Sequence, residues 1–430
     1  MKSVMKIKKS RNRQVLVFLL CIVFLTGCGG KTAAEKMNEG DTNENAMLIC
    51  AKTGVKKISE GSFSKEVEYS DCTLRISCLG DENDVLRLQS AAASFEEIYP
   101  GIKTEFVKMD YNALPAEKGM PVSQMKALDA DIYQIEWSWL YEENADETMF
   151  YDLYKEHERI SLGNIGQQYL NLCTVEEKLQ AIPIELSGKI FCFNESLFEA
   201  VGMDVPETLA ELLQAGETFR TRLGEEYYPL ALTIEDRMEL LVYYLQSVYG
   251  KDWIVDGVLQ FYAEEVETGM AFLLELENAH VIPTLQYARS DESRGRDAGW
   301  KNGTYGGVFA DSSDFMSVEN MLPDGSRVVV AERFRDMGTG KGGYVEVADA
   351  YAVSESSTHK QESALFLDFL INDEIDKVEK IALDGSYLMN YDYAKMMKTD
   401  TLYEDIIVGL SYGDYNAREA AQLLLDSFDY

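Results

Sequence analysis

The segment Thr73-Leu74-Arg75-Ile76-Ser77-Cys78-Leu79 begins a strand–helix–strand unit that decides the fold. Its polar and apolar residues alternate as in a strand, and the alternation stops at Gly80. Apolar residues then recur at helical spacing from Val85 to Tyr99, Pro100-Gly101 ends that helix, and a second alternating stretch runs from Ile102 to Met109. Two strands joined by a helix are the building unit of a parallel sheet covered by helices. The sequence therefore predicts an α/β fold.

The same alternation of strands and helices continues along the chain. Thr208-Leu209-Ala210-Glu211 matches a capping box, which opens a helix by satisfying two backbone donors. The run from Gly338 to Gly343 lacks the spacing of a phosphate-binding loop and is expected to be an ordinary loop. The patterns predict strands at 131–136, 189–193, 230–233, 305–310 and 344–353, and helices at 122–128, 195–201, 208–223, 237–248, 263–278 and through most of the remainder.

Length and charge limit the class of protein. A chain of 430 residues exceeds the size at which a single core stops growing, so we expect about two domains. The formal net charge is −34, with 74 acidic and 40 basic residues. A surface this negative repels phosphate backbones and anionic headgroups, which argues against nucleic-acid binding and against electrostatic adsorption to membranes.

The first 28 residues have the pattern of a secretion signal. A basic segment precedes an apolar run from Val15 to Leu25, which is about half as long as a membrane-spanning helix. The run ends in Leu25-Thr26-Gly27-Cys28, which resembles a bacterial lipobox. This resemblance implies that residues 1–27 are a signal peptide and that Cys28 carries the lipid. Residues 28–70 are then a flexible tether, and the protein is anchored to the extracellular face of the bacterial cell membrane.

The cysteines and histidines give no sign of a metal site or a disulfide framework. Five cysteines follow Cys28, an odd number without close pairs, and the sequence leaves their redox state open: Cys50, Cys72, Cys78, Cys173 and Cys192. The three histidines, His157, His280 and His359, are far apart in the sequence. We therefore expect no zinc site and no cofactor.

Three stretches in order resemble the extracellular solute-binding lipoproteins of ABC importers (family 1-like), including the oligosaccharide binders. They are the first helix with its Pro100-Gly101 turn, the segment from Ile190 to Thr208, and the strand Tyr351-Ala352-Val353-Ser354 with the helix from Ser363 to Leu370. The segment from Ile190 to Thr208 is the most specific, because it combines a strand, a short helix, a glycine stop and a Pro-x-Thr helix start. Together the three cover most of residues 70–385.

This resemblance implies a two-lobed, periplasmic-binding-protein-like type II fold, with mixed sheets flanked by helices and a cleft between the lobes. Residues 71–182 and 345–430 would form the first lobe, and residues 183–344 the second. The implied protein is a monomer that captures a small organic molecule, with carbohydrate as the first choice, for the subunits of an ABC permease. Binding without catalysis is the expected activity.

Ligand-contacting residues are expected in the loops at the carboxyl ends of the strands, where open α/β sheets bind ligands. Trp137 and Trp139 are expected at the end of a strand, facing together either the cleft or the core. Tyr344 and Trp300 also fit a core position, and a solvated carboxylate is the alternative for Glu136. Helix capping is the alternative at residues 311–313, and Asp349 in an apolar strand needs a partner or a function. The candidates are Asp81, Glu136, Trp137, Trp139, Glu185, Ser187, Asp311, Ser313, Tyr344 and Asp349.

A second resemblance leaves an enzyme open as the alternative. Ile182-Pro183-Ile184-Glu185-Leu186-Ser187 is similar to the segment that carries the nucleophilic cysteine of type I thiaminases (thiamine pyridinylases). Here Ser187 stands at the cysteine position, and the activating glutamate falls near Ser313, with Asp314 adjacent. Serine without a strong base is a poor nucleophile, and Cys192 is expected in the core. This likeness implies a binder of a thiamine-like cation, with a pyridinylase-like transferase as the remaining possibility.

Overall fold

The computed structural model describes residues 68–79, 82–109, 120–142, 146, 148–285, 289–331, 333–339, 341–371, 377–399 and 402–428. The predicted signal peptide, Cys28, nearly all of the tether, Cys50 and Asp81 lie outside these residues. Within them, no helix combines the length and the apolar character that crossing a membrane requires.

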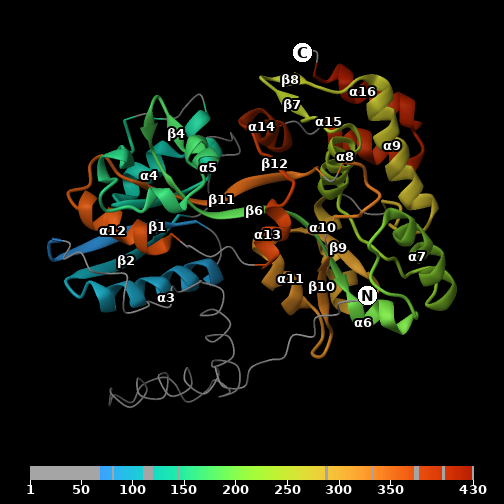
Figure 1. Cartoon of the computed structure of the whole chain (residues 1–430), viewed down its shortest axis with the longest axis horizontal. Helices are drawn as coiled ribbons and strands as arrows, with labels where there is room; N and C mark the ends of the chain where they lie inside the picture. The colour runs from blue at the N-terminus through green and yellow to red at the C-terminus, as the bar shows by residue number, and fades with distance from the viewer. Residues whose placement is uncertain are drawn as a thin grey trace. The chain divides into compact units, whose positions relative to one another are not determined.

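A mixed sheet of eight strands organises the described residues (Figure 1). Its strands are β1 (Cys72–Cys78), β2 (Ile102–Lys108), β3 (Ile132–Ile135), β6 (Ile182–Asn194), β9 (Gly307–Asp311), β10 (Val328–Ala331), β11 (Tyr344–Val353) and β12 (Tyr387–Leu388). The order is β10-β6-β11-β3-β1-β2, with β9 added to β6 and β12 added to β11. The β1 strand is parallel to β2 and β3, whereas β11 is antiparallel to both β3 and β6. Two hairpins stand apart: β4 (Thr174–Val175) with β5 (Lys178–Leu179), and β7 (Ile254–Val255) with β8 (Val258–Leu259).

Helices flank this sheet. They are α3 (Glu82–Ile98), α4 (Val122–Leu128), α5 (Gln167–Leu172), α6 (Glu195–Ala200), α7 (Leu209–Arg222), α8 (Ile234–Tyr249), α9 (Ala263–Asn278), α10 (Arg289–Asn302), α11 (Phe315–Met321), α12 (Lys360–Leu370), α13 (Lys377–Leu383), α14 (Tyr391–Thr399), α15 (Leu402–Tyr412) and α16 (Ala417–Asp426). Among the residues that the structure describes there are also four 3-10 helices: η2 (Trp137–Tyr141), η3 (Leu153–Glu156), η4 (Leu162–Asn164) and η5 (Ser312–Asp314).

The strand–helix–strand unit is confirmed as β1, α3 and β2, which shows that the alternation patterns were correctly interpreted. The predicted capping box is also present: the Glu211 amide donates to Thr208 Oγ1 at 3.1 Å, and the Thr208 amide donates to Glu211 Oε2 at 3.1 Å. Both backbone donors at the start of α7 are thereby satisfied, which fixes where that helix begins.

Two strand predictions need correction. The strand predicted at 189–193 is the end of the 13-residue β6, so Glu185–Gly188 lies inside a strand and not in a loop. The reason is that β6 continues to pair with β11 through these residues. The segment 230–233 makes only a single bridge, Ala231 with Val308, because Thr233 caps α8 through a bond from the Asp236 amide to its hydroxyl.

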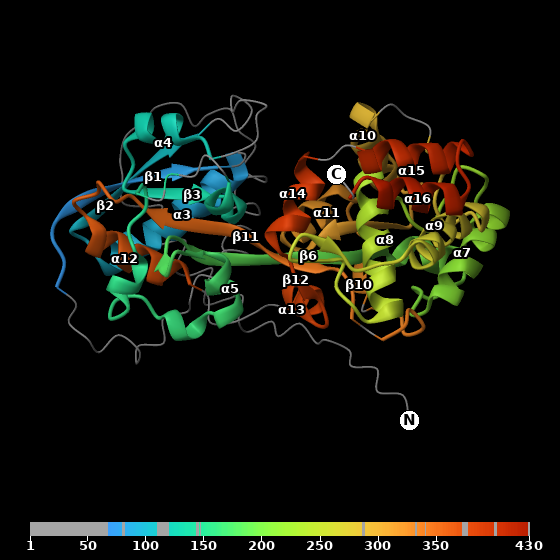
Figure 2. The ribbon, with the colours of Figure 1, turned by 90° about the horizontal axis from the view of Figure 1, so that it is seen from above.

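Two strands link the separate hydrophobic clusters. The cluster around β1, β2, β3, α3 and α12 includes Ile182 of β6 and Val347 of β11. The other end of β6 supplies Phe191 to the cluster around α6 and α7, and Tyr344 of β11 belongs to the cluster around α8 and α9. Figure 2 shows β6 and β11 side by side along this course. The fold is therefore α/β, with a mixed sheet, flanking helices and two shared central strands.

The last helices pack where the sequence analysis did not expect them. Helices α15 and α16 contact α8 and α9, and they share one hydrophobic cluster that includes Leu241, Met270, Ile407 and Leu424 (Figure 2). The sequence analysis assigned all of 345–430 to the first lobe, whereas these helices cover elements of 183–344. The C-terminal helices carried an amphipathic pattern, but that pattern does not tell which partner a helix covers.

Substitution of Phe95 tests the packing of the first hydrophobic cluster, the one around β1, β2, β3, α3 and α12. Its side chain is 0% exposed, and its ring centroid lies 5.1 Å from that of Phe366 on α12. Replacing Phe95 with alanine leaves a cavity between α3 and α12, so we expect a loss of about 3–5 kcal/mol in the free energy of unfolding. Urea unfolding measures this change in the free energy of unfolding. Leu86→Ala on the same helix, at a side chain 48% exposed, is the control and should change stability by less than about 0.5 kcal/mol. Equal effects of the two substitutions would contradict this packing.

Candidate functional site

A small cavity lies where β6, β9, β11, α8 and α14 meet. It measures about 20 Å³, counted as the space open to the centre of a water molecule, which is room for one or two waters. Carboxylates, hydroxyls, one ammonium group and aromatic rings surround it: Ser187, Gly188, Lys189, Glu239, Tyr243, Phe309, Asp311, Gly343, Tyr344, Glu346, Met389 and Tyr393.

Two glycines let the cavity walls approach each other. A Cβ on Gly188 would lie 2.8 Å from the Tyr344 carbonyl oxygen on the neighbouring strand. Gly343 has φ +70°, and a Cβ there would lie 2.5 Å from the Tyr243 ring. Side chains at these positions would push β6, β11 and α8 apart, so both glycines are required by the close packing around the cavity.

Lys189 is the central charge of the site. Its Nζ lies 2.7 Å from Glu239 Oε2, 3.1 Å from Asp311 Oδ2 and 3.7 Å from Asp236 Oδ1. Arg296 Nη1 adds a second cation 3.1 Å from the other oxygen of Asp236. Burial alone would lower the pKa of Lys189, but the carboxylates of Glu239, Asp311 and Asp236 raise that pKa well above its usual value. Lys189 therefore stays charged at neutral pH.

The acidic side of the cluster is crowded. Burial raises the pKa of Glu239 to about 8, because the nearby charges of Asp311 and Asp236 offset the attraction of Lys189. Burial also raises the pKa of Glu235, on the same helix. Glu239 Oε2 is buried, and none of the described residues makes a well-directed hydrogen bond to it. Burial therefore favours the protonated form of Glu239, whose carboxyl group belongs to the cavity lining and can bond with a ligand or water there.

Aromatic rings close another side. The Tyr344 ring centroid lies 4.3 Å from that of Tyr393, and the Tyr344 hydroxyl donates a hydrogen bond to Asp252. Burial and the neighbouring Asp252 raise the pKa of Tyr344, so this hydroxyl remains protonated. Tyr344 is 5% exposed and belongs to a hydrophobic cluster, yet the residue is also part of the cavity lining. The two positions weighed in the sequence analysis, core and ligand site, are thus compatible here.

Ser187 lies among other serines. Its Oγ lies 3.0 Å from Ser313 Oγ and 3.4 Å from Ser312 Oγ, and it accepts a hydrogen bond from the Ser313 amide. Its hydrogen-bond partners within the described residues include no imidazole and no carboxylate. An unactivated serine does not supply the nucleophile that thiaminase chemistry requires. Neither Asp311 nor Asp314 makes a side-chain cap at η5 or α11, so the capping alternative for 311–313 is not supported.

Asp349 and Glu185 form a second polar group outside the cavity lining. They are opposite each other in the β11–β6 pairing, at an irregularity in the register. Gln134 Nε2 donates to Asp349 Oδ1 at 2.6 Å, and Arg87 Nη1 lies 3.9 Å from Glu185 Oε2. Asp349 therefore has a partner, as a carboxylate in an apolar strand requires.

The tryptophan candidates are buried. Trp137 and Trp139 are 3% and 5% exposed, within the first hydrophobic cluster. They belong to the 3-10 helix η2, so the expected strand alternation does not apply to them. Glu136 precedes η2 and is half-buried. Glu136, Trp137 and Trp139 are absent from the cavity lining. Trp300 is also a core residue, and its Nε1 donates a hydrogen bond to the Val318 carbonyl.

Much of the cavity lining was not predicted from the sequence. Lys189 carried a signal, because a lysine that begins the apolar run Ile190-Phe191-Cys192-Phe193 must find partners when the strand is buried. Glu239 and Tyr243 carried no such signal, because in the sequence they are ordinary members of the amphipathic pattern of α8. Met389 and Tyr393 come from a segment whose packing the sequence left open.

Cysteine chemistry lies apart from the cavity lining. Cys72, Cys78, Cys173 and Cys192 are free thiols, and Cys192 is buried as expected. Burial raises the pKa of Cys192 to about 12, which keeps it unreactive at neutral pH. Spacing along the chain had indicated no cysteine–histidine cluster, but folding brings Cys72, His359 and Glu362 together.

Comparisons with known proteins agree with this architecture. No curated protein matches the chain. Similar solved structures include a periplasmic solute binding protein from Pectobacterium atrosepticum (22% identity, TM-score 0.67, covering 83% of this chain and 98% of that one). A periplasmic oligogalacturonide binding protein from Yersinia enterocolitica, in complex with saturated digalacturonic acid, has 21% identity and a TM-score of 0.67 over 83% and 98% of the two chains. The GacH receptor of Streptomyces glaucescens, studied with acarbose, has 16% identity and a TM-score of 0.66 over 84% and 98%.

At these identities, the similar structures establish the fold alone. The sequence goes further, because the family model described as bacterial extracellular solute-binding protein matches residues 81–377, more than half of the chain. That match covers the strand–helix–strand unit from α3 onward, all of β6 and β11, and most of the cavity lining. The chain therefore belongs to the bacterial extracellular solute-binding protein family.

Proposed function

We propose that this protein is a lipid-anchored extracellular receptor that captures a neutral or cationic carbohydrate and delivers it to an ABC permease. The chemistry of the cavity between β6, β9, β11, α8 and α14 carries this proposal. Family membership supports capture of a solute, and the names of similar structures, which bind digalacturonic acid or acarbose, support carbohydrate as its class.

The lining suits a molecule with hydroxyl groups and flat apolar faces. Asp311 and Glu346 offer oxygens that accept hydrogen bonds from hydroxyl groups. Protonated Glu239 can donate as well as accept, and the Lys189 ammonium donates. Once the walls separate, aromatic residues of the lining such as Tyr344 and Tyr393 would offer ring faces on which a sugar ring can stack.

The charge balance favours neutral or amino-bearing ligands over acidic ones. Even where Glu239 holds its proton, three other acidic side chains lie at or beside the cavity: Asp236, Asp311 and Glu346. They outnumber the two cations there, Lys189 and Arg296. A carboxylate-bearing sugar placed in this cavity would therefore meet a surplus of acidic groups. In this respect, the proposed ligand differs from the digalacturonic acid bound by the Yersinia protein.

Capture requires movement. A cavity of about 20 Å³ is too small for a sugar ring, so the walls must separate to admit one. The β6 and β11 strands join the hydrophobic clusters, and their pairing is irregular between Val347 and Ala350. We infer that bending there opens the site and that the ligand favours the closed form by contacting both sides. The closed form would then present the surface that the permease recognises.

Ligand binding tests the assignment. In a thermal-shift screen of the full chain, we expect neutral sugars or amino sugars to raise the melting temperature, because a ligand bound only to the folded state stabilises it. Asp311→Asn should weaken the affinity for the stabilising sugar about 10- to 100-fold, as measured by calorimetry. This is the usual cost of losing a hydrogen bond to a charged group. Asp324→Asn, on an exposed turn, is the matched control and should leave affinity unchanged.

Two outcomes would contradict this assignment. Stabilisation by uronic acids alone would refute the charge argument. Base exchange between thiamine and an added nucleophile, lost in Ser187→Ala, would replace binding with the thiaminase alternative.

The protonation of Glu239 gives a pH test. Its folded pKa of about 8 exceeds the ordinary value of 4.5, so the folded state holds a proton that the unfolded state releases between those values. This contribution to stability is present below pH 4.5 and is lost as pH rises through 8. Glu239→Gln imitates the protonated form, so its stability relative to the wild type should rise across this window, by at most about 1.4 kcal/mol per pH unit.

Chemical denaturation at several pH values measures that difference. Glu264→Gln, at an exposed glutamate of α9, should show a pH-independent difference. If Glu239→Gln were equally pH-independent, Glu239 would be ionised throughout.

The lipid anchor is tested at Cys28. If the lipobox directs acylation, wild-type cells should incorporate labelled palmitate into the protein, and Cys28→Ser should abolish labelling and release the chain into the medium. Cys192→Ser is the control for loss of a cysteine, since Cys192 is buried, and its labelling should match the wild type. Retained labelling of Cys28→Ser would contradict anchoring at this residue.

A further inference from the structure

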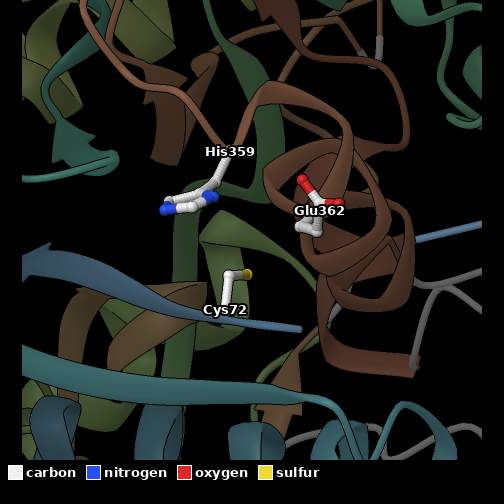
Figure 3. Close-up of side chains that lie close together, drawn as sticks. All are labelled: Cys72, His359 and Glu362. Carbon is white, nitrogen blue, oxygen red and sulfur yellow. The ribbon is translucent and has the colours of Figure 1, made fainter. Parts of the chain in front are cut away.

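A mixed cluster of potential metal ligands lies away from the cavity lining, between β1 and the start of α12 (Figure 3). Cys72 is the first residue of β1, His359 immediately precedes α12, and Glu362 lies in the first turn of α12. One thiol sulfur, one imidazole nitrogen and one carboxylate oxygen all lie within 4.8 Å of one another. They join parts of the chain separated by nearly 290 residues.

The cluster is oriented and reachable. Glu362 is 5% exposed, and its Oε1 accepts a hydrogen bond from the Ser70 amide at 2.7 Å, which fixes the carboxylate beside β1. Cys72 and His359 are each half-exposed, so an ion can reach them. Within the described part of the chain, neither the Cys72 sulfur nor the His359 ring makes a hydrogen bond that a metal ion would have to break.

The surroundings are negative. Besides Glu362, the carboxylates of Asp131 and Asp71 lie close enough for their charges to act on the Cys72 thiol. Asp131 is itself held in place, since its Oδ2 accepts from the Arg75 amide at 2.9 Å and its Oδ1 accepts from Ser357 Oγ at 2.5 Å. A bound dication would be stabilised by this excess of negative charge.

The donor set selects the kind of ion. Sulfur and imidazole nitrogen are ligands of zinc and similar ions, whereas calcium and magnesium prefer oxygen alone. Zinc bonds of about 2.0–2.3 Å in tetrahedral geometry place neighbouring donors about 3.5 Å apart. The present donors all lie within 4.8 Å of one another, so they need to approach by at most about 1.3 Å, which rotation of two half-exposed side chains can provide.

We propose that Cys72, His359 and Glu362 form a zinc site that fastens the beginning of β1 to the beginning of α12. Three protein ligands leave the fourth tetrahedral position to a water molecule. The ion would link the start of β1 to the start of α12, and its fourth position would stay open to solvent. Because Ser70 bonds to the same glutamate, the end of the tether is held there too.

Zinc titration of the full chain, first stripped with a chelator, tests the site. We expect one additional equivalent of bound zinc relative to Cys72→Ser, measured by elemental analysis after gel filtration. Zinc in hundredfold excess over its dissociation constant should raise the melting temperature of the wild type by about 3 °C. Cobalt should produce a thiolate-to-metal absorption band that Cys72→Ser lacks, whereas calcium and magnesium should have no effect.

Two further variants separate metal binding from folding. His359→Gln should lose the extra equivalent while keeping the metal-free melting temperature, and His157→Gln, at an exposed histidine, should bind like the wild type. Equal zinc binding by the wild type, Cys72→Ser and His359→Gln would overturn the proposal, as would failure of the wild type to bind. Sugar binding is measured in parallel, and its loss or retention bears on the proposed function alone.

Discussion

The antiparallel pairing of β6 with β11 is the constraint on which the rest of the structure depends. Ile182–Gly188 pairs with Val345–Tyr351, so two segments about 160 residues apart become neighbours. One end of this ladder lies in the first hydrophobic cluster, and the other reaches Tyr344 and the cavity. Gly188 makes the pairing possible at the cavity, since any Cβ there would meet the Tyr344 carbonyl oxygen. Without this ladder, the clusters would share no strand, and the cavity would lose two of its walls.

The sequence predicted those features that depend on local pattern. The unit from β1 to β2 and the capping box at Thr208 follow from periodicity and capping chemistry, which act over a few residues. The candidates Asp311 and Tyr344 line the cavity from strand ends that could be estimated, whereas Ser187 lines it from inside β6, which is longer than predicted.

Packing between segments far apart in the sequence could not be predicted from such local patterns. Glu239 reaches the cavity only because α8 is placed against β6, and no pattern within α8 distinguishes that glutamate from its neighbours on the helix. For Trp137 and Trp139 the sequence left cleft and core open, and both rings lie in the core, in the 3-10 helix that follows β3. Their residue type suggested a ligand site, but burial depended on the backbone turn.

The ionic cluster around Lys189 has an unusual energetic character. Desolvating an ammonium and several carboxylates costs more than a well-packed apolar cluster of the same size, so such groups are a poor source of stability. Here they lie in and beside a cavity, with Lys189 Nζ 2.7 Å from Glu239 Oε2. If the cavity binds the proposed ligand, these polar groups contribute to its selectivity more than to the stability of the fold.

The packing of α15 and α16 against α8 and α9 has a consequence for how the chain is made. Residues 402–428 follow α8 and α9 by more than a hundred residues in the chain, yet they cover apolar faces of both helices. Until α15 and α16 have been synthesised, those faces have no permanent cover, so α8 and α9 cannot complete their packing by themselves. This hydrophobic cluster therefore depends on contacts between segments that are made at different times.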